Sequence, residues 1–281
     1  MKTIPFDSVV DSIENLVMQT NYKLPDDVLK ALVQARELES SERTVSIFDQ
    51  IIENASIASS EHVPICQDTG VAVFFADVGE GLSVDGGGIE AAIQEGTRRG
   101  YTNGGLRMSM VKDPLRRQNT KDNTPAIIHF NIVKGEGLTV YFCPKGGGCE
   151  NMSRLAMLTP GDGKDGIVRF VVETIRQGGG KPCPPVIVGV GIGGNFEYSA
   201  HLSKRSLLRT VGERNPDPFY ADLEQELLEK INCLGIGPMG LGGNTTALDV
   251  FIEAFPCHIA SMPVAVNIQC HAARHGKTVL C

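Results

Sequence analysis

Apolar positions in the first sixty residues recur with helical spacing. Three successive stretches repeat an apolar side chain every three or four residues, and they begin near residue 9, at Pro25 and near residue 41. In the second stretch Pro25 precedes Asp26 and Asp27, and a proline followed by acidic residues is typical of a helix start. The pattern therefore predicts a helical N-terminal region over about 1–61.

The pattern changes near residue 62 to short runs of β-branched and aromatic residues that glycines interrupt. These runs predict strands at 71–78, 126–133, 138–144, 184–191, 248–255 and 262–269. Helical spacing returns at 88–99, 166–176, 197–210 and 216–233. The sequence thus predicts a mixed α/β (α+β) fold in which a glycine-rich region follows the helices. We expect one domain over 1–281, with the functional residues in the region of about 62–281.

Composition and charge exclude several functions. The formal net charge of -7 gives no sign of a basic surface that would neutralise phosphates. Only 6% of the residues are aromatic, so few side chains could stack on bases. No apolar run approaches the ~18 residues of a membrane span. Asp7 and Asp11 stand where a secretory signal needs an apolar core. We expect a cytoplasmic protein that binds neither nucleic acid nor membrane.

Two glycine-rich loops match nucleotide motifs only in form. Residues 189–194 satisfy G-x-G-x-x-G after a strand, but a turn near Asn215 stands where a dinucleotide site needs an acidic residue at a strand end. Residues 235–246 resemble a phosphate loop, with Asn244 where that loop needs lysine. A nicotinamide-dependent oxidoreductase is therefore disfavoured. Two interpretations of these glycines stay open. They could let peptide N–H groups approach an anion or a cluster, or they could form tight turns in a packed fold.

Three cysteines stand in unusual polar or proline-rich settings. Cys66 begins the segment Cys-Gln-Asp-Thr-Gly and so places a soft metal ligand beside an amide, a carboxylate and a hydroxyl. Cys183 lies between prolines, and Cys270 begins Cys-His-Ala-Ala-Arg-His. No two cysteines have Cys-x-x-Cys spacing, and disulfides are not expected in a reducing compartment.

Together these motifs resemble the alpha subunit of the class I, iron-sulfur dependent fumarate hydratases and of the closely similar L-tartrate dehydratases. The resemblance covers essentially the whole chain, through segments 66–70, 104–130, 144–155, 181–195, 234–250 and 258–275. It implies that Cys66, Cys183 and Cys270 hold three irons of a 4Fe-4S cluster and leave the fourth iron open to substrate. An open iron can bind the hydroxyl of a 2-hydroxy acid as a Lewis acid without redox change.

The resemblance also implies the residues that bind substrate. Gln67 and Asp68 line the site, Arg107 binds a carboxylate, His258 contacts the substrate, and the backbone around Gly147 and Gly148 approaches it. The planar guanidinium of arginine matches a carboxylate with two parallel hydrogen bonds. Asp68 and His258 are interpreted as the catalytic residues, with Asp68 as a participant in proton transfer.

Other residues near these motifs are expected to play supporting parts. His271, Arg274 and His275 follow Cys270 closely, and we interpret them as supports for the site or as contacts to another subunit. Cys149 stands where much of the family is expected to have serine, so we interpret it as a structural or supporting residue rather than a cluster ligand.

The leading hypothesis is the alpha subunit of a hydro-lyase that interconverts fumarate and (S)-malate. The alternative is an L-tartrate dehydratase alpha subunit, which gives oxaloacetate. A non-catalytic iron-sulfur sensor or carrier is a hypothesis of a different class, and it would not need a pocket for a small dicarboxylate. Single-chain relatives have a further carboxy-terminal β domain that supplies basic residues and a hydroxyl base. We therefore expect a beta subunit as partner, a hetero-oligomer, and little activity from the isolated chain.

Overall fold

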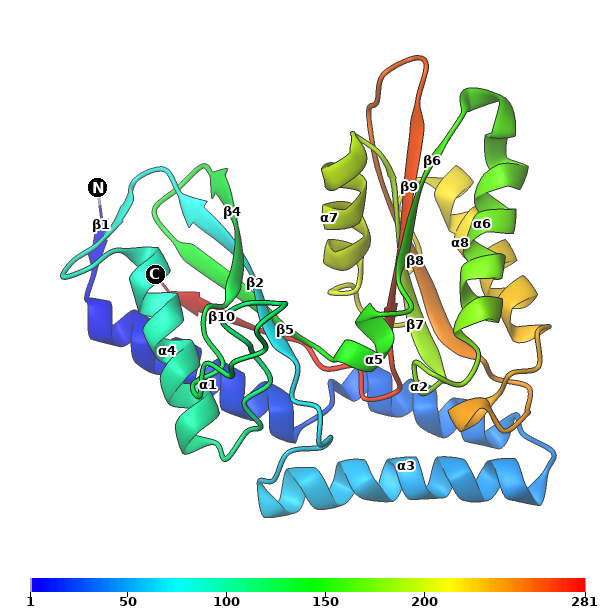
Figure 1. Ribbon diagram of the computed structural model, residues 1–281, viewed down its shortest axis with the longest axis horizontal. Coiled ribbons are helices and arrows are strands. Elements are labelled where there is room, and N and C mark those ends of the chain that lie inside the picture. The colour runs from blue at the N-terminus through cyan, green and yellow to red at the C-terminus, as the bar shows by residue number, and fades with distance from the viewer. Residues whose placement is uncertain (1, 281) are drawn as a thin grey trace. The chain divides into compact units, whose positions relative to one another are not determined.

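The computed structural model describes residues 2–280 and divides the chain into two compact units (Figure 1). Unit 1 contains the residues up to Pro25, Asn54–Gly147 and the residues from Arg274 onwards. Unit 2 contains Asp26–Glu53 and Gly148–Ala273. Each unit is described by itself, and the assignment of 1–281 to a single domain stays a prediction.

The helical N-terminal region is confirmed. Helix α1 spans Phe6–Tyr22, α2 spans Asp26–Glu37 and α3 spans Glu42–Glu61. The apolar stripe of α1 includes Val9, Val10 and Ile13, which are fully buried in the core of unit 1. Within residues 2–280, no helix is both long enough and apolar enough to cross a membrane.

Unit 1 is built around a four-stranded sheet with the order β10-β5-β2-β4. Strand β2 pairs with β4 in parallel and with β5 antiparallel, and β5 also pairs antiparallel with β10. Helices α1 and α4 pack against one face of this sheet and bury its apolar side chains. The elements not yet given are β1 (Lys2–Ile4), β2 (Val71–Gly79), β3 (Leu82–Val84), α4 (Ile89–Asn103), β4 (Ile127–Val133), β5 (Leu138–Lys145) and β10 (Gly276–Leu280).

Unit 2 holds a second four-stranded sheet with the order β6-β9-β7-β8. Its central strand β7 is buried along its whole length, with α6 and α8 on one face of the sheet and α7 on the other (Figure 1). The elements are α5 (Gly147–Glu150), β6 (Arg154–Leu158), η1 (Pro160–Asp162), α6 (Gly163–Gly178), β7 (Val186–Gly193), α7 (Phe196–Ser206), α8 (Pro218–Asn232), η2 (Pro238–Gly240), β8 (Ala247–Phe255) and β9 (Met262–Gln269).

The mixed α/β class is confirmed, and each expected strand and helix has a counterpart. The six predicted strands are β2, β4, β5, β7, β8 and β9, and the later predicted helices are α4, α6, α7 and α8. The helix expected over 197–210 ends at Ser206. The polar segment 113–125 forms a loop in which Asp113 Oδ1 accepts the N–H groups of Leu115 and Arg116.

Two glycines of the first glycine-rich motif allow close packing of a helix on a strand. Gly189 and Gly191 lie within β7 and face α7. A Cβ at Gly189 would lie 2.1 Å from the carbonyl oxygen of Ser203, and one at Gly191 would lie 2.0 Å from that of Ser199. Any side chain here would push the helix away from the sheet. For these two glycines, the structure supports packing rather than ligand approach.

We expect Gly191→Ala to lower the free energy of unfolding by about 1–3 kcal/mol, the usual cost of overpacking a core. Urea denaturation followed by circular dichroism would measure the difference. Gly161→Ala is a matched control, because its nearest atom, Thr159 Oγ1, would lie at an ordinary distance of 3.8 Å. Equal stability of the two variants would contradict the packing role of Gly191.

The second glycine-rich loop, 235–246, does bind an anion, but that anion is a side chain of the same chain. The N–H of Asn244 donates to both carboxylate oxygens of Glu39 at 2.9 Å, and the N–H of Thr245 donates to Glu39 Oε1 at 2.9 Å. Arg43 Nη2 donates to the carbonyl of Leu241 at 2.7 Å. In this structure the peptide N–H groups of the loop hold the Glu39 carboxylate.

Candidate functional site

The segment 66–70 connects α3 to β2 in unit 1 and places three polar groups in sequence. Cys66 and Asp68 are half-buried and Gln67 is exposed. The Cys66 thiol donates to Gln67 Oε1 at 3.4 Å, and its sulfur accepts the N–H of Asp68 at 3.4 Å. A sulfur atom that accepts a peptide N–H is suited to carry negative charge as a metal ligand.

Peptide N–H groups fix the carboxylate of Asp68. Oδ1 accepts the N–H of Gly70 at 3.0 Å, and Oδ2 accepts the N–H of Gly147 at 2.7 Å. Gly147 belongs to the glycine triplet 146–148, whose backbone at Gly147 and Gly148 is expected to approach the substrate. Gly148 is exposed and is the first residue of this stretch in unit 2. The structure therefore joins Asp68 to the glycine triplet through Gly147.

The buried side chain of Arg274 anchors the segment 66–70 by a hydrogen bond to its backbone. Its side chain is only 2% exposed, and its Nη2 donates to the carbonyl oxygen of Asp68 at 2.9 Å. Nη1 donates to Asn21 Oδ1 at 3.3 Å, which ties the guanidinium to α1. Of the two readings left open by the sequence, support of the site is the one that fits this burial, because a buried guanidinium is not on a surface that another subunit could reach.

Tyr101 is a second buried anchor, and sequence reasoning missed it. Its ring is fully buried at the end of α4, and its hydroxyl donates to the carbonyls of Thr69 at 2.8 Å and Gly70 at 3.2 Å. Burial raises the pKa of Tyr101, so the phenol keeps its proton and acts as a donor. Gly70 itself must be glycine, because its φ is +76° and a Cβ would lie 2.7 Å from Lys145 N.

We expect Tyr101→Phe to lower the free energy of unfolding by about 1–2 kcal/mol, because the buried carbonyl of Thr69 loses the Tyr101 donor and that of Gly70 keeps only Asn123. Thermal or urea denaturation would measure the loss. Tyr141→Phe is the control, since Tyr141 is a half-buried tyrosine of β5 in the same unit. A Tyr101→Phe protein as stable as the control would remove Tyr101 from the anchoring role.

The Arg107 loop is tied to the same segment. Thr69 Oγ1 donates to the carbonyl of Arg107 at 2.8 Å. The buried Asn123 donates from Nδ2 to the carbonyl of Gly70 at 3.0 Å, and its Oδ1 accepts the N–H of Ser109 at 2.7 Å. The Arg107 side chain is exposed. Unit 1 therefore brings together three of the predicted site residues, namely Gln67, Asp68 and Arg107, on loops joined by hydrogen bonds.

Unit 2 places Cys183 and Cys270 at the same end of its sheet. Cys183 precedes β7 and Cys270 follows β9, and Ile187 is paired with Gln269 across these antiparallel strands. The carbonyl of Cys183 accepts the N–H of His271 at 3.2 Å and its Nδ1–H at 3.0 Å. His271 thus joins the Cys183 loop to the segment that carries Cys270 by two hydrogen bonds.

His258 lies at the other end of that sheet. It is an exposed residue of the turn between β8 and β9, and its Nδ1 accepts the N–H of Ala260 at 3.1 Å. Cys270 follows the far end of the intervening strand β9, which at ~3.4 Å per residue is roughly 25 Å long. The structure does not bring His258 together with Cys183 and Cys270, and its contact with substrate stays a prediction.

Exposure distinguishes the three predicted ligands from the other cysteines. All cysteines within residues 2–280 are thiols, and Cys66, Cys183 and Cys270 are the half-buried ones. Cys143 and Cys149 are buried, Cys233 and Cys257 are exposed, and Cys281 lies outside the described residues. Cys149 packs in the core of unit 2 and donates to Gln269 Oε1 at 3.7 Å, in keeping with its structural interpretation.

The donor set fits an iron-sulfur cluster in its chemistry. Thiolates are the usual ligands of such clusters, and partly accessible thiols on loops can be reached by iron and sulfide. Cys66 is in unit 1 and the other two cysteines are in unit 2. Neither unit by itself, within residues 2–280, gathers three or more His, Cys, Asp or Glu side chains into a metal site. The ligand set therefore stays a prediction.

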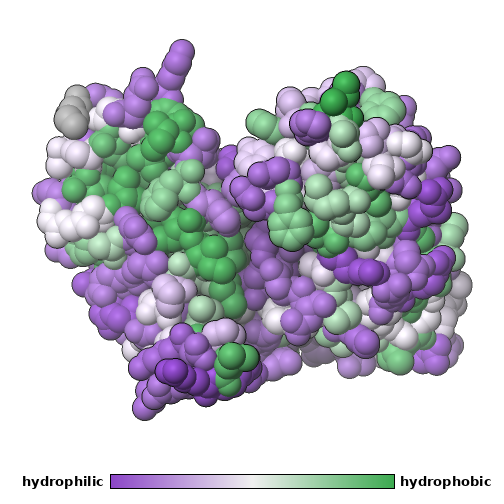
Figure 2. All heavy atoms as spheres, turned by 45° about the horizontal axis from the view of Figure 1, so that its top comes forward, coloured by the Kyte–Doolittle hydropathy of each residue, from purple (hydrophilic) through white to green (hydrophobic). Residues whose placement is uncertain are grey.

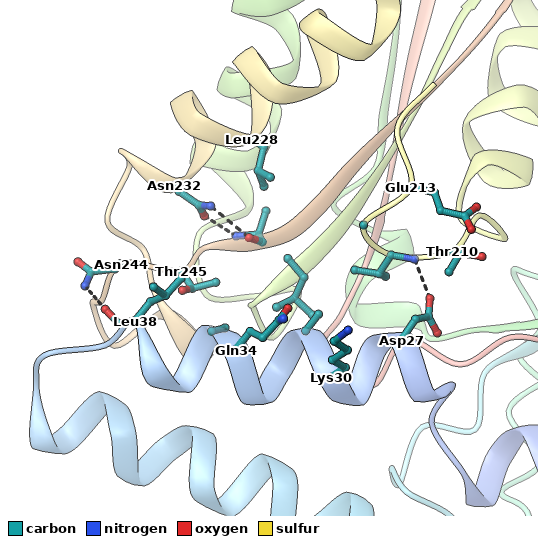
Figure 3. Close-up of a pocket in the computed structure, with 16 residues that line it drawn as sticks. Asp27, Lys30, Gln34, Leu38, Thr210, Glu213, Leu228, Asn232, Asn244 and Thr245 are labelled. Carbon is teal, nitrogen blue, oxygen red and sulfur yellow. Dashed lines mark hydrogen bonds between the residues drawn. The ribbon is translucent and has the colours of Figure 1, made fainter. Parts of the chain in front are cut away.

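A cavity of about 700 Å³ in unit 2 contains none of the predicted site residues (Figure 3). It lies between α2, the segment 210–213 and the start of β8. Two of its polar side chains bond within the chain: Asp27 Oδ2 accepts the N–H of Val211 at 2.7 Å, and Asn244 Nδ2 donates to the carbonyl of Leu38 at 3.0 Å. We assign no part of the chemistry to this cavity.

Comparison with known proteins gives consistent matches along the chain. Residues 10–279 match the family described as fumarate hydratase (Fumerase). The chain is 47% identical over 274 residues to the putative L(+)-tartrate dehydratase subunit alpha of Methanocaldococcus jannaschii, covering 95% of this chain and 96% of that protein. It is 33% identical over 275 residues to the L(+)-tartrate dehydratase subunit alpha of Escherichia coli strain K12, covering 97% of this chain and 90% of that protein. The protein of that name from Shigella sonnei matches with the same identity and coverage.

Proposed function

The chain belongs to the fumarate hydratase family, and from this we propose that it is the alpha subunit of a hydro-lyase that adds water to a small unsaturated dicarboxylate and removes it again. Fumarate and (S)-malate are the proposed pair. Conversion of L-tartrate to oxaloacetate is the second candidate, and the names of the relatives at 47% and 33% identity favour it. The observation that carries the proposal is the family match over 10–279, together with the motif residues 66–70 and Arg107 joined in unit 1.

We propose that Cys66, Cys183 and Cys270 hold a 4Fe-4S cluster. When bound, the cluster supplies a Lewis-acidic iron for the substrate hydroxyl. The support is chemical: these three are the half-buried thiols within residues 2–280, and Cys66 sulfur accepts a peptide N–H. A sensor or carrier would need the cysteines but not the dicarboxylate-binding residues beside them.

The chain's own polar residues bind and orient the substrate in this proposal. The exposed guanidinium of Arg107 pairs with a substrate carboxylate, and the Gln67 amide and the backbone at Gly148 donate further hydrogen bonds. Together with the hydroxyl base that the partner subunit supplies, Asp68 takes part in the proton transfer at the substrate. Its two oxygens are held by the N–H groups of Gly70 and Gly147, so the carboxylate keeps one orientation through the reaction.

His258 is proposed as a substrate contact on the resemblance alone. Because it lies at the far end of the unit 2 sheet from Cys183 and Cys270, its role needs its own test. His258→Asn should raise KM or lower kcat if the side chain contacts substrate, and unchanged kcat/KM would remove it from the site.

We propose a beta subunit as the partner of this chain, in a cytoplasmic hetero-oligomer. The relatives named above are called subunit alpha, which supports a second subunit. In this proposal the partner supplies the remaining basic residues, so the isolated chain turns over little substrate.

The test is anaerobic purification of the chain with its companion subunit, followed by iron and sulfide analysis and assays with fumarate, malate, L-tartrate and D-tartrate. About four irons per chain with fumarate and malate turnover would support the leading proposal. Preference for L-tartrate would replace it with the second candidate. A cluster without activity toward any of these acids would indicate a sensor or carrier, and a complex that contains zinc or no metal would overturn the ligand assignment.

A further inference from the structure

Strand β4 is an edge of the unit 1 sheet and carries apolar side chains to the surface (Figure 1). Ile127, Phe130 and Ile132 are 47%, 46% and 68% exposed. Figure 2 shows apolar residues gathered on the surface of the unit that contains this strand. Proteins usually protect such an edge with lysine, proline or a bulge, but 127–133 contains no charged residue or proline and keeps a continuous register with β2.

The backbone of β4 directs alternate peptide groups away from the sheet. The carbonyl of Val133 accepts the N–H of Glu80 at 2.9 Å, so the odd-numbered residues of β4 turn their peptide groups toward β2. In a parallel ladder the residues between them point both N–H and C=O to the opposite side. Those residues are Ile128, Phe130 and Ile132, and within residues 2–280 no strand pairs with that side of β4.

The sequence of β4 reads nearly the same in both directions around Phe130. Ile128 matches Ile132, His129 matches Asn131 and Ile127 matches Val133. A two-fold axis at Phe130 would therefore place like residues opposite each other in an antiparallel pair. The N–H and C=O of Phe130 point away from β2. With the axis at this residue, the outward N–H and C=O groups of Ile128, Phe130 and Ile132 would all hydrogen-bond to the second strand.

We propose that β4 pairs antiparallel with β4 of a second copy of this chain and joins two four-stranded sheets into one. The pairing is self-complementary, as a two-fold interface requires, and it brings no two like charges together. Phe130 is paired with Ala76 of the buried core, so the contact extends the apolar face that α1 and α4 cover. The inference rests on the strand alone and is independent of the proposed activity.

Cysteine cross-linking tests the register. Opposed residues in a hydrogen-bonded antiparallel pair have Cα atoms about 5.5 Å apart, which a disulfide can bridge. Phe130→Cys should therefore form a chain-to-chain disulfide under mild oxidation of the full-length protein, with any companion subunit bound. The two copies of Ile132→Cys would lie four positions apart along the strands, roughly 13 Å, and should not cross-link.

On a non-reducing gel, we expect a band of about 60 kDa, twice the 30.2 kDa chain, for Phe130→Cys and not for Ile132→Cys or wild type. Mass spectrometry would identify both halves as this chain. No dimer band from Phe130→Cys, equal bands from both variants, or a disulfide to a different protein would each overturn the proposal.

A charge variant tests the association itself. Phe130→Lys puts two ammonium groups opposite each other and should reduce the copies of this chain per particle from two to one in sedimentation equilibrium. Val279→Lys is the matched control, because Val279 is 57% exposed on β10, the other edge of the same sheet. A folded Phe130→Lys protein that keeps two copies, or wild type with one copy, would contradict β4 pairing.

Discussion

Replacement of Cys66 by alanine should abolish binding of the proposed cluster and lower hydro-lyase activity at least ~1,000-fold. A Lewis-acidic metal contributes several kcal/mol to the stabilisation of a transition state, and each ~1.4 kcal/mol is a factor of ten in rate. The half-buried Cys66 side chain lies on a loop, so its loss should leave the fold intact. Iron content, visible absorption and turnover of the anaerobic complex would measure the effect.

Cys233→Ala provides the control for this variant. Cys233 is exposed at the end of α8, and its replacement should change neither iron content nor turnover. Cys183→Ala and Cys270→Ala should behave like Cys66→Ala. Full iron content in any of these three variants would show that the cysteine in question is not a ligand.

The second large effect is expected at Arg274. Arg274→Met should lower the free energy of unfolding by about 3 kcal/mol, because a buried hydrogen bond from a charged donor contributes ~1.5–3 kcal/mol and Arg274 makes two. Release of the buried charge offsets part of this loss. The carbonyl of Asp68 loses its donor, so kcat should fall as well. Urea denaturation and the kinetics of the same preparation would measure both.

Arg176→Met is the matched control for Arg274→Met. Arg176 is an exposed arginine of α6 that pairs with Glu173 on the surface, and such pairs contribute little. Arg274→Lys should recover only part of the stability, since an ammonium group lacks the fork that reaches both Asn21 and Asp68. If Arg274→Met and Arg176→Met had equal stability, the guanidinium would not be an anchor.

Periodicity was enough to predict the long elements but not the short ones. Strands such as β2 and β7 are six or more residues of apolar character, and their local pattern identifies them. Strand β10, at Gly276–Leu280, is only half-buried and pairs with β5, far away in the sequence. Its pairing depends on contacts that no local pattern contains, and β1, β3 and β6 were missed for the same reason.

Sequence motifs were enough to predict the site residues, whereas the residues that anchor them could be identified only in the structure. Gln67, Asp68 and Arg107 stand in recognisable segments of the sequence. Tyr101 and Asn123 have no motif of their own, and their roles follow from burial against the carbonyl of Gly70. Arg274 did carry a signal, because it follows Cys270 by four residues. The sequence could not reveal that its guanidinium is buried rather than exposed.

The anchor of the Cys66 loop also sets an order of events during synthesis. Arg274 follows Cys66 by 208 residues, 274 minus 66, and strand β10 of the same unit comes later still. At ~5–20 residues per second, the ribosome needs roughly 10–40 s to reach Arg274 after Cys66 has been made. For that time the carbonyl of Asp68 lacks its buried donor, and the loop that carries Cys66 is held only by anchors made earlier, such as Tyr101 and Asn123. The Cys66 loop is therefore complete only after Arg274 has been translated, and insertion of the proposed cluster into the finished loop would follow that step.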